Sequence, residues 1–117
     1  MKGKIYLIPT TLGDSNINSV LPEIIKNTVD NISYFIVENI RTSRRYIRKL
    51  LPQKDIDSLT FYELNKHTDQ NEIPTFIKAA FDGYDIGIMS EAGNPGIADP
   101  GSTVVIEAHK KNISVIL

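Results

Sequence analysis

Two groups of residues in this sequence have the types and spacing needed for chemistry. Residues 90–101 form a loop with three glycines and two prolines, which stiffen the chain at some points and let main-chain amides approach a ligand at others. Four arginines recur at i, i+3, i+4 and i+7, the spacing of one helix face: Arg41, Arg44, Arg45 and Arg48. Guanidinium groups offer forked, permanently charged donors to phosphate oxygens. The loop predicts a ligand site and the arginines an anion-binding face; a purely structural turn and a solvated helix face are the alternatives.

Single ionisable residues near these groups have narrower roles. Glu38 stands at a predicted strand end just before the arginines, where it could pair with one of them or act as a proton acceptor. Asp99 is suited to cap a helix that starts near Gly101. His67 and His109 have no neighbouring cluster of ligand side chains, so we expect no metal site.

The elements that must position these residues follow from the apolar pattern. Continuous apolar runs predict strands over residues 4–9, 34–37, 58–62, 85–89 and 113–117, with the first strand in a central place. Helices are predicted over residues 22–29, 41–51, 73–81 and 102–109, after an irregular lead-in to the first. Their sheet-facing stripes comprise Ile17, Val20, Leu21, Ile24 and Ile25; Ile40, Ile47, Leu50 and Leu51; and Ile73, Phe76, Ile77, Ala80 and Phe81.

Strands that alternate with helices indicate right-handed crossovers. We therefore expect an α/β fold, with a five-stranded, mainly parallel sheet and helices on both faces. The loop at residues 90–101 then leaves the carboxyl end of a strand. Ligands of open parallel sheets bind at that edge.

Length and composition bound the protein class. The chain has 117 residues, 41% of them hydrophobic, a net charge of −1 and no cysteine. We expect one domain without disulfides or thiolate metal sites, a local rather than global basic patch, no membrane partner and a cytoplasmic location. Because the sequence stops within an apolar, β-favouring run, we expect a second domain to continue beyond Leu117. The alternative is a complete single domain that ends in a C-terminal strand.

Three segments, each following a predicted strand, resemble the tetrapyrrole methylase superfamily. They are residues 9–14 (PTTLGD), 38–45 (ENIRTSRR) and 90–101 (SEAGNPGIADPG). Within that superfamily they are most similar to the branch that methylates a ribose 2′-hydroxyl of 16S ribosomal RNA. The family's usual Glu-Asp-Thr-Arg reads Glu38-Asn39-Ile40-Arg41 here, and its Ser-Asp-Ala-Gly-Thr-Pro reads Ser90-Glu91-Ala92-Gly93-Asn94-Pro95.

The resemblance implies an S-adenosylmethionine-dependent methyltransferase whose cofactor lies between two α/β domains. Residues 1–117 would be the N-terminal domain, and the whole protein a homodimer acting on ribosomal RNA. Arg41, Arg44 and Arg45 would bind the RNA, and Glu38 would help to take the proton from the ribose hydroxyl. The implied cofactor-binding residues are Pro9, Ser90, Glu91, Ala92, Gly93, Asn94, Gly96 and Ile97; Glu91 could equally cap the following helix.

Two other functions remain open on the same residues. A methyltransferase for a tetrapyrrole, a porphyrin or corrin, would also use the arginines because its substrate is rich in carboxylates. A non-catalytic anion-binding or interaction domain would keep the fold while the substitutions at Asn39, Ile40, Glu91 and Asn94 abolished transfer. RNA binding should weaken steeply with added salt and fall on Arg44→Ala, whereas tetrapyrrole binding should perturb an absorption spectrum. Failure of the full-length protein to bind S-adenosylmethionine would count against both enzyme hypotheses.

Overall fold

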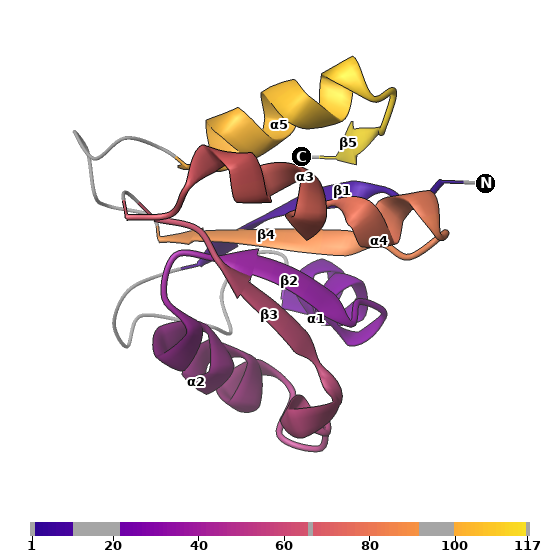
Figure 1. Cartoon of the computed structure of the whole chain (residues 1–117). Coiled ribbons are helices and arrows are strands. Elements are labelled where there is room, and N and C mark those ends of the chain that lie inside the picture. The colour runs from indigo at the N-terminus through magenta and orange to yellow at the C-terminus, as the bar shows by residue number, and fades with distance from the viewer. Residues whose placement is uncertain (1, 11–21, 66, 92–99, 117) are drawn as a thin grey trace.

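The computed structural model describes residues 2–10, 22–65, 67–91 and 100–116. A sheet of five strands in the order β3-β2-β4-β1-β5 runs through the molecule (Figure 1). Every pair of neighbouring strands is parallel. The strands are β1 (Ile5–Thr10), β2 (Tyr34–Val37), β3 (Thr60–Glu63), β4 (Ile86–Glu91) and β5 (Val115–Ile116). The predicted fold class is confirmed, but β4, not β1, is the middle strand.

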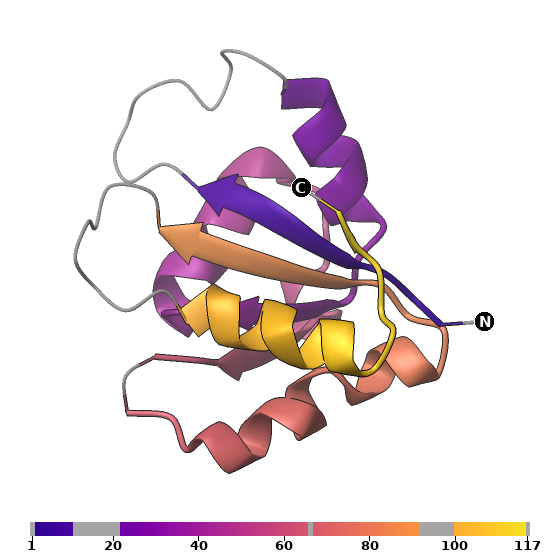
Figure 2. The ribbon, with the colours of Figure 1, turned by 90° about the horizontal axis from the view of Figure 1, so that it is seen from above.

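Helices cover both faces of this sheet, as Figures 1 and 2 show. α1 (Pro22–Asp30) and α2 (Ile40–Leu50) supply side chains to one core, whereas α3 (Ile73–Phe76), α4 (Lys78–Phe81) and α5 (Pro100–Lys110) supply the other. Two short 3₁₀ turns, η1 (Ile56–Ser58) and η2 (Gln70–Glu72), precede β3 and α3. The sheet is therefore buried on both sides, as parallel sheets require.

The core beneath α1 and α2 is built around Phe35, which is fully buried in β2 and stacks on Phe61 with ring centroids 5.5 Å apart. Gly87 lies opposite Phe35 in the register of β2 and β4. A Cβ atom at Gly87 would stand 3.1 Å from the Phe35 ring and 2.8 Å from Cδ1 of Ile8. The glycine thus leaves the room that the aromatic ring fills.

Two residues that the sequence pattern placed in the core, Ile24 and Phe81, are exposed. Ile24 is 62% exposed, because α1 packs through Ile25 and Val29, one turn apart, and the adjacent position points roughly 100° away. Phe81 is 43% exposed, because the predicted helix over residues 73–81 is broken at Ile77, where φ −99° and ψ 5° leave the helical range. The break turns Phe81 outward, and the ammonium group of Lys2 lies 5.6 Å from its ring centroid.

The other helix and strand boundaries differ from the predicted ones by only a few residues. β3 begins after η1 and ends at Glu63, one residue beyond the strand predicted over residues 58–62. β2 has the predicted bounds, and α2 ends at Leu50, just before Pro52. The predicted lead-in before Pro22 lies outside the described residues, as do Ile17, Val20 and Leu21.

Candidate functional site: the carboxyl edge of the sheet

The parallel register brings the ends of four strands to one edge. Pro9 pairs with Ser90 across β1 and β4, and Thr10 pairs with Glu91. Of the predicted cofactor residues, Pro9, Ser90 and Glu91 therefore lie together at the ends of adjacent strands. The others, Ala92, Gly93, Asn94, Gly96 and Ile97, lie outside the described residues, as does the predicted cap Asp99.

Glu38 stands on the same edge, directly after β2, and is half-buried. Val37 pairs with Met89 of β4 on one side and with Glu63 of β3 on the other. The predicted proton acceptor is thus placed one strand away from Ser90 and Glu91. This is the arrangement expected if the β4 loop holds one reactant and the start of α2 holds the other.

The start of α2 is capped by two side chains. Oδ1 of Asn39 accepts a hydrogen bond from the main-chain N–H of Thr42 at 3.0 Å, in the manner of an N-cap. Oε1 of Glu63 accepts from the N–H of Ile40 at 3.1 Å. Both acceptors occupy donors that an anion would otherwise use. The negative charge of Glu63 also lies at the positive end of the helix.

The two faces of α2 differ as the pattern predicted. Ile47 and Leu50 are buried, and Ile40 is half-buried against the same core. The opposite face exposes Arg41, Arg45 and Arg48, and none of these three forms an ion pair within the described part of the chain. Their guanidinium groups are therefore available to an anionic ligand.

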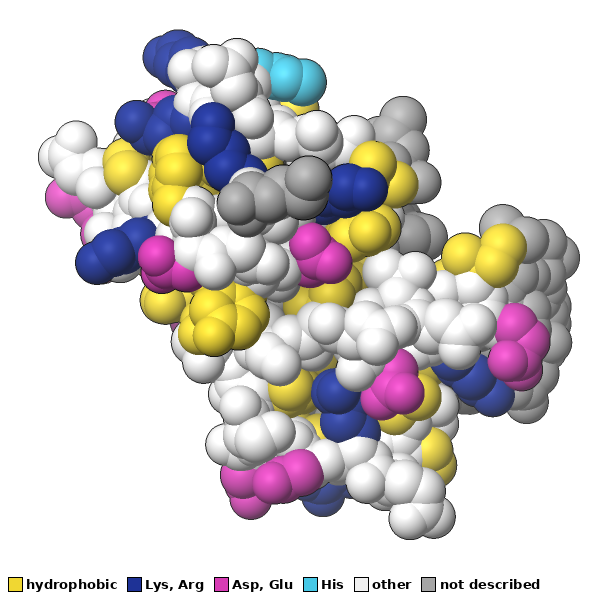
Figure 3. All heavy atoms as spheres, turned by 90° about the vertical axis from the view of Figure 1, so that its right-hand side faces the viewer, with side chains coloured by type: hydrophobic (Ala, Val, Ile, Leu, Met, Phe, Trp, Pro, Cys, Tyr) yellow, Lys and Arg dark blue, Asp and Glu magenta, His cyan; other side chains and the backbone are white. Residues whose placement is uncertain are grey.

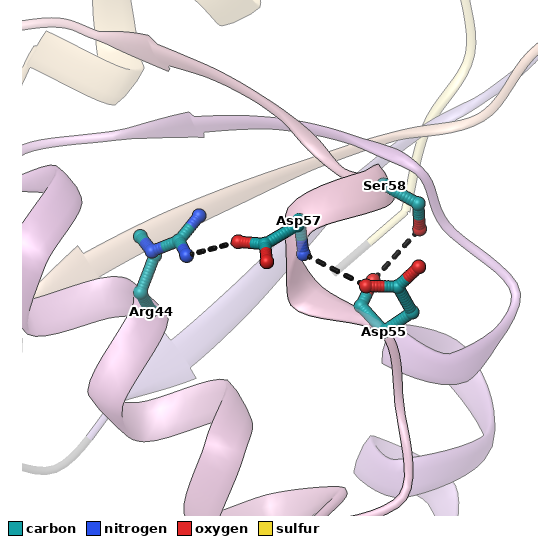
Figure 4. A network of polar contacts seen from close by, with 4 residues as sticks. All are labelled: Arg44, Asp55, Asp57 and Ser58. Atoms are coloured by element: carbon teal, nitrogen blue, oxygen red, sulfur yellow. Dashed lines mark hydrogen bonds and ion pairs between the residues drawn. The ribbon is translucent and has the colours of Figure 1, made fainter.

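Arg44 is held differently from its three neighbours. Its Nη2 donates to Oδ1 of Asp57 at 2.8 Å (Figure 4). Its guanidinium carbon lies 5.9 Å from the centroid of the Phe61 ring. The Arg44 side chain is 35% exposed, whereas that of Asp57 is 87% exposed. The structure thus separates Arg44 from Arg41 and Arg45, which the sequence pattern treated alike.

Tyr46 lies between the two faces of α2, partly buried against the same core as Ile47. Removal of its hydroxyl from water disfavours the charged phenolate and raises the pKa of Tyr46 above its ordinary value of 10.0. Burial thus favours the neutral form of Tyr46, whose ring packs in the core beneath α2.

The two histidines are both exposed. His67 is exposed in a turn where its N–H donates to Oδ1 of Asn65 at 2.9 Å, and His109 is exposed in the last turn of α5. Among the described residues there is no group of three or more His, Asp or Glu side chains suited to a metal ion. None of the helices in the described ranges is long and apolar enough to cross a membrane.

The opposite, amino edge of the sheet carries a polar hollow. Its volume is about 350 Å³, and it is lined by Tyr6, Asn27, Thr28, Asn31, Ile32 and Asp85. Part of its polar lining is engaged within the chain: Oδ1 of Asp85 accepts from the N–H of Lys4 at 2.8 Å. Figure 3 shows this side of the molecule, where acidic, basic and hydrophobic side chains alternate without a field of one sign.

Sequence reasoning missed two carboxylates that contact α2: Glu63, at the carboxyl edge of the sheet, and Asp57, in the η1 turn that precedes β3. Glu63 follows Tyr62 in a strand, and the parallel pairing of Val37 with Glu63 could have suggested that both strand ends meet near Asn39. Asp57 lies 13 residues from Arg44 in a 3₁₀ turn. Its contact with Arg44 depends on how the chain returns from α2 to β3, which no local pattern encodes.

The chain is an α/β domain with a parallel sheet, and its fold is similar to that of a solved methyltransferase. It aligns with the crystal structure of the methyltransferase CobJ with a TM-score of 0.60 and 16% identity, over 99% of this chain and 45% of that one. At this identity the likeness concerns the fold alone. No family model matches the sequence.

Sequence relatives make the relationship more particular. The chain is 27% identical over 114 residues to Ribosomal RNA small subunit methyltransferase I of Synechocystis, covering 97% of this chain and 38% of the relative. It is 32% identical over 117 residues to the protein of that name from Halalkalibacterium halodurans, covering 98% and 37%, and 30% identical to that of Helicobacter pylori, covering 93% and 40%. The resemblance to the tetrapyrrole methylase superfamily is confirmed, and the chain spans about two-fifths of the length of these curated relatives.

Proposed function

We propose that this chain is part of an S-adenosylmethionine-dependent methyltransferase that methylates a ribose 2′-hydroxyl of small-subunit ribosomal RNA. The observation that carries the proposal is the similarity, over nearly the whole chain, to proteins named Ribosomal RNA small subunit methyltransferase I. The exposed arginines beside the carboxyl edge of the sheet agree with a polyanionic substrate.

The proposed cofactor wall is the end of β1 together with the end of β4. Pro9 and Ser90 are register partners, so the two chain segments that leave these strands start side by side. The wall would comprise Pro9, Ser90, Glu91, Ala92, Gly93, Asn94, Gly96 and Ile97, with a second domain beyond Leu117 completing it. S-adenosylmethionine, when bound, supplies a methyl group on an already activated sulfonium. The protein then contributes mainly position and orientation.

The proposed substrate side is the start and outer face of α2. Arg41 and Arg45, which form no ion pair with the residues that the structure describes, bind phosphate oxygens of the RNA backbone, and Arg44 assists them. Glu38, at the end of β2, accepts the proton of the ribose 2′-hydroxyl as that oxygen becomes the nucleophile. Asn39 and Glu63 hold the first turn of α2, so they fix the direction in which these side chains leave the sheet edge.

The cellular setting follows from this function. A protein that modifies ribosomal RNA works where ribosomes are assembled, so we propose a cytoplasmic location. We also propose that the whole protein is a homodimer, as the family resemblance implies.

Two measurements on the full chain test the proposal. Binding of a small-subunit ribosomal RNA fragment should weaken steeply as salt is raised, because each phosphate contact releases counterions. Radiolabelled methyl from S-adenosylmethionine should then appear on the RNA, at a 2′-oxygen, when the protein containing this chain is assayed. Salt-independent RNA binding would contradict the substrate class. A perturbed absorption spectrum on addition of a porphyrin or corrin, without RNA binding, would favour the tetrapyrrole alternative.

A further inference from the structure

Asp57 introduces a negative charge beside the basic face of α2. Its Oδ1 lies 2.8 Å from Nη2 of Arg44, yet 87% of the Asp57 side chain is exposed to solvent (Figure 4). An exposed ion pair of this kind contributes little net free energy, because both charges remain partly hydrated. Folding therefore does not require the pair, and another anion can replace the carboxylate at small cost.

The turn that carries Asp57 is nevertheless well built. Oδ1 of Asp55 accepts from the N–H of Asp57 at 3.2 Å, and the Asp55 carbonyl accepts from Oγ of Ser58 at 2.7 Å. Ile56, between them, is buried in the core beneath α2. The turn thus fixes the main chain of Asp57, from which its carboxylate reaches Arg44.

Arg44 is equally fixed from its own side. Its guanidinium carbon lies over the Phe61 ring, at 5.9 Å from the centroid, within the range of a cation–π contact. The hydrogen bond to Asp57 uses one nitrogen of the Arg44 guanidinium group, which has five N–H donors in all. A phosphate oxygen presents the same acceptor chemistry as the carboxylate.

We propose that Asp57 is an intramolecular competitor for RNA phosphate at Arg44. In the free protein its carboxylate occupies the guanidinium group, and RNA binding exchanges that carboxylate for a backbone phosphate. The inference rests on the proposed RNA substrate. Its consequence is selectivity. A polyanion that contacts Arg44 alone must displace Asp57, whereas an RNA that also reaches Arg41 and Arg45 gains contacts for which no described residue competes.

The test is Asp57→Asn in the full chain, with binding of a fluorescently labelled, short single-stranded ribo-oligonucleotide followed by anisotropy over a range of salt. We expect the variant to bind more tightly than the wild type by up to about fivefold, the worth of one exposed ion pair. Asp82→Asn removes an exposed carboxylate after α4, on the other face of the sheet, and serves as the charge-matched control without such a gain. Asp57→Ala, checked for an unchanged thermal midpoint, tests whether the gain in affinity comes from loss of the carboxylate and not from new contacts of the asparagine side chain.

The Arg44→Gln background separates competition from a general electrostatic effect. In the Arg44→Gln background, Asp57→Asn should change RNA affinity no more than Asp82→Asn does, because the guanidinium group for which Asp57 and phosphate compete is absent. An equal gain with and without Arg44, or no gain in either Asp57 variant while the wild type binds RNA, would overturn the inference but leave the proposed function standing. Failure of the wild type and both Asp57 variants to bind RNA would overturn both.

Discussion

The two faces of α2 are governed by different physics. On the inner face Ile47 is fully buried and Leu50 is 3% exposed, packed against β2 and the η1 turn. On the outer face Arg41, Arg45 and Arg48 are exposed and form no ion pair with described residues. On the inner face each buried methylene group contributes to the free energy of unfolding, whereas the exposed charges of the outer face barely affect it. Substitutions on the two faces should therefore separate folding from ligand binding.

The largest effect is expected for Ile47→Ala. Loss of a fully buried branched side chain removes its transfer free energy and leaves a cavity, which should lower the free energy of unfolding by about 2–5 kcal/mol. Urea denaturation followed by circular dichroism measures this. Arg48→Ala, at the next position on the exposed face, is the matched control and should stay within about 0.5 kcal/mol of the wild type. Similar losses for the two variants would refute the division of α2 into a folding face and a binding face.

A smaller effect is expected at the helix start, where the two faces meet. Asn39→Ala removes the acceptor for the N–H of Thr42 and should cost about 0.5–2 kcal/mol in the same assay. Asn39→Asp keeps the acceptor and adds a negative charge at the positive end of the helix, so it should be at least as stable as the wild type. Equal destabilisation by Ala and Asp would mean that the cap does not stabilise α2.

On the outer face, Arg45→Gln should leave stability within about 0.5 kcal/mol of the wild type and still weaken RNA binding. If Arg45 binds one phosphate, the slope of log affinity against log salt should fall by about one. Lys78→Gln removes the same charge from α4 on the other side of the sheet and should leave the slope unchanged. Identical slopes for the wild type and Arg45→Gln would remove Arg45 from the proposed substrate site.

The division of α2 was predictable because it depends on local periodicity. The i, i+3, i+4, i+7 spacing of the arginines and the apolar positions at Ile47 and Leu50 are properties of a single helix, and α2 is long enough to keep its register. The prediction was wrong at Phe81 because its register assumed one helix across Ile77, where the chain instead turns. Strand order, with β4 in the middle, is decided by pairing between distant segments.

The placement of the candidate site residues on one sheet edge was also predictable, whereas their long-range partners were not. The alternation of strands and helices places Pro9, Glu38 and Ser90 on one edge, because parallel strands share their carboxyl end. The partners Glu63 and Asp57 were missed because each reaches α2 through a long-range contact, from the end of β3 and from the η1 turn. These two carboxylates modify what the helix offers to a ligand, so the sequence pattern alone overstated the similarity of Arg44 to its neighbours.

The smallest effect is expected at Tyr46, on the border between the faces, and only at high pH. Burial raises the pKa of Tyr46 in the folded protein, so the unfolded chain loses the phenolic proton first, near pH 10. The contribution to stability is complete below that pH and is lost as pH rises through the folded pKa. Tyr46→Phe, which cannot ionise, should therefore lose less stability than the wild type between neutral and strongly alkaline pH. Denaturant midpoints at several alkaline pH values measure the difference, and Tyr84→Phe, at an exposed tyrosine, is the control for loss of a phenol. If Tyr46→Phe loses as much stability at alkaline pH as the wild type, the Tyr46 hydroxyl is hydrated and this border of α2 belongs to the outer face.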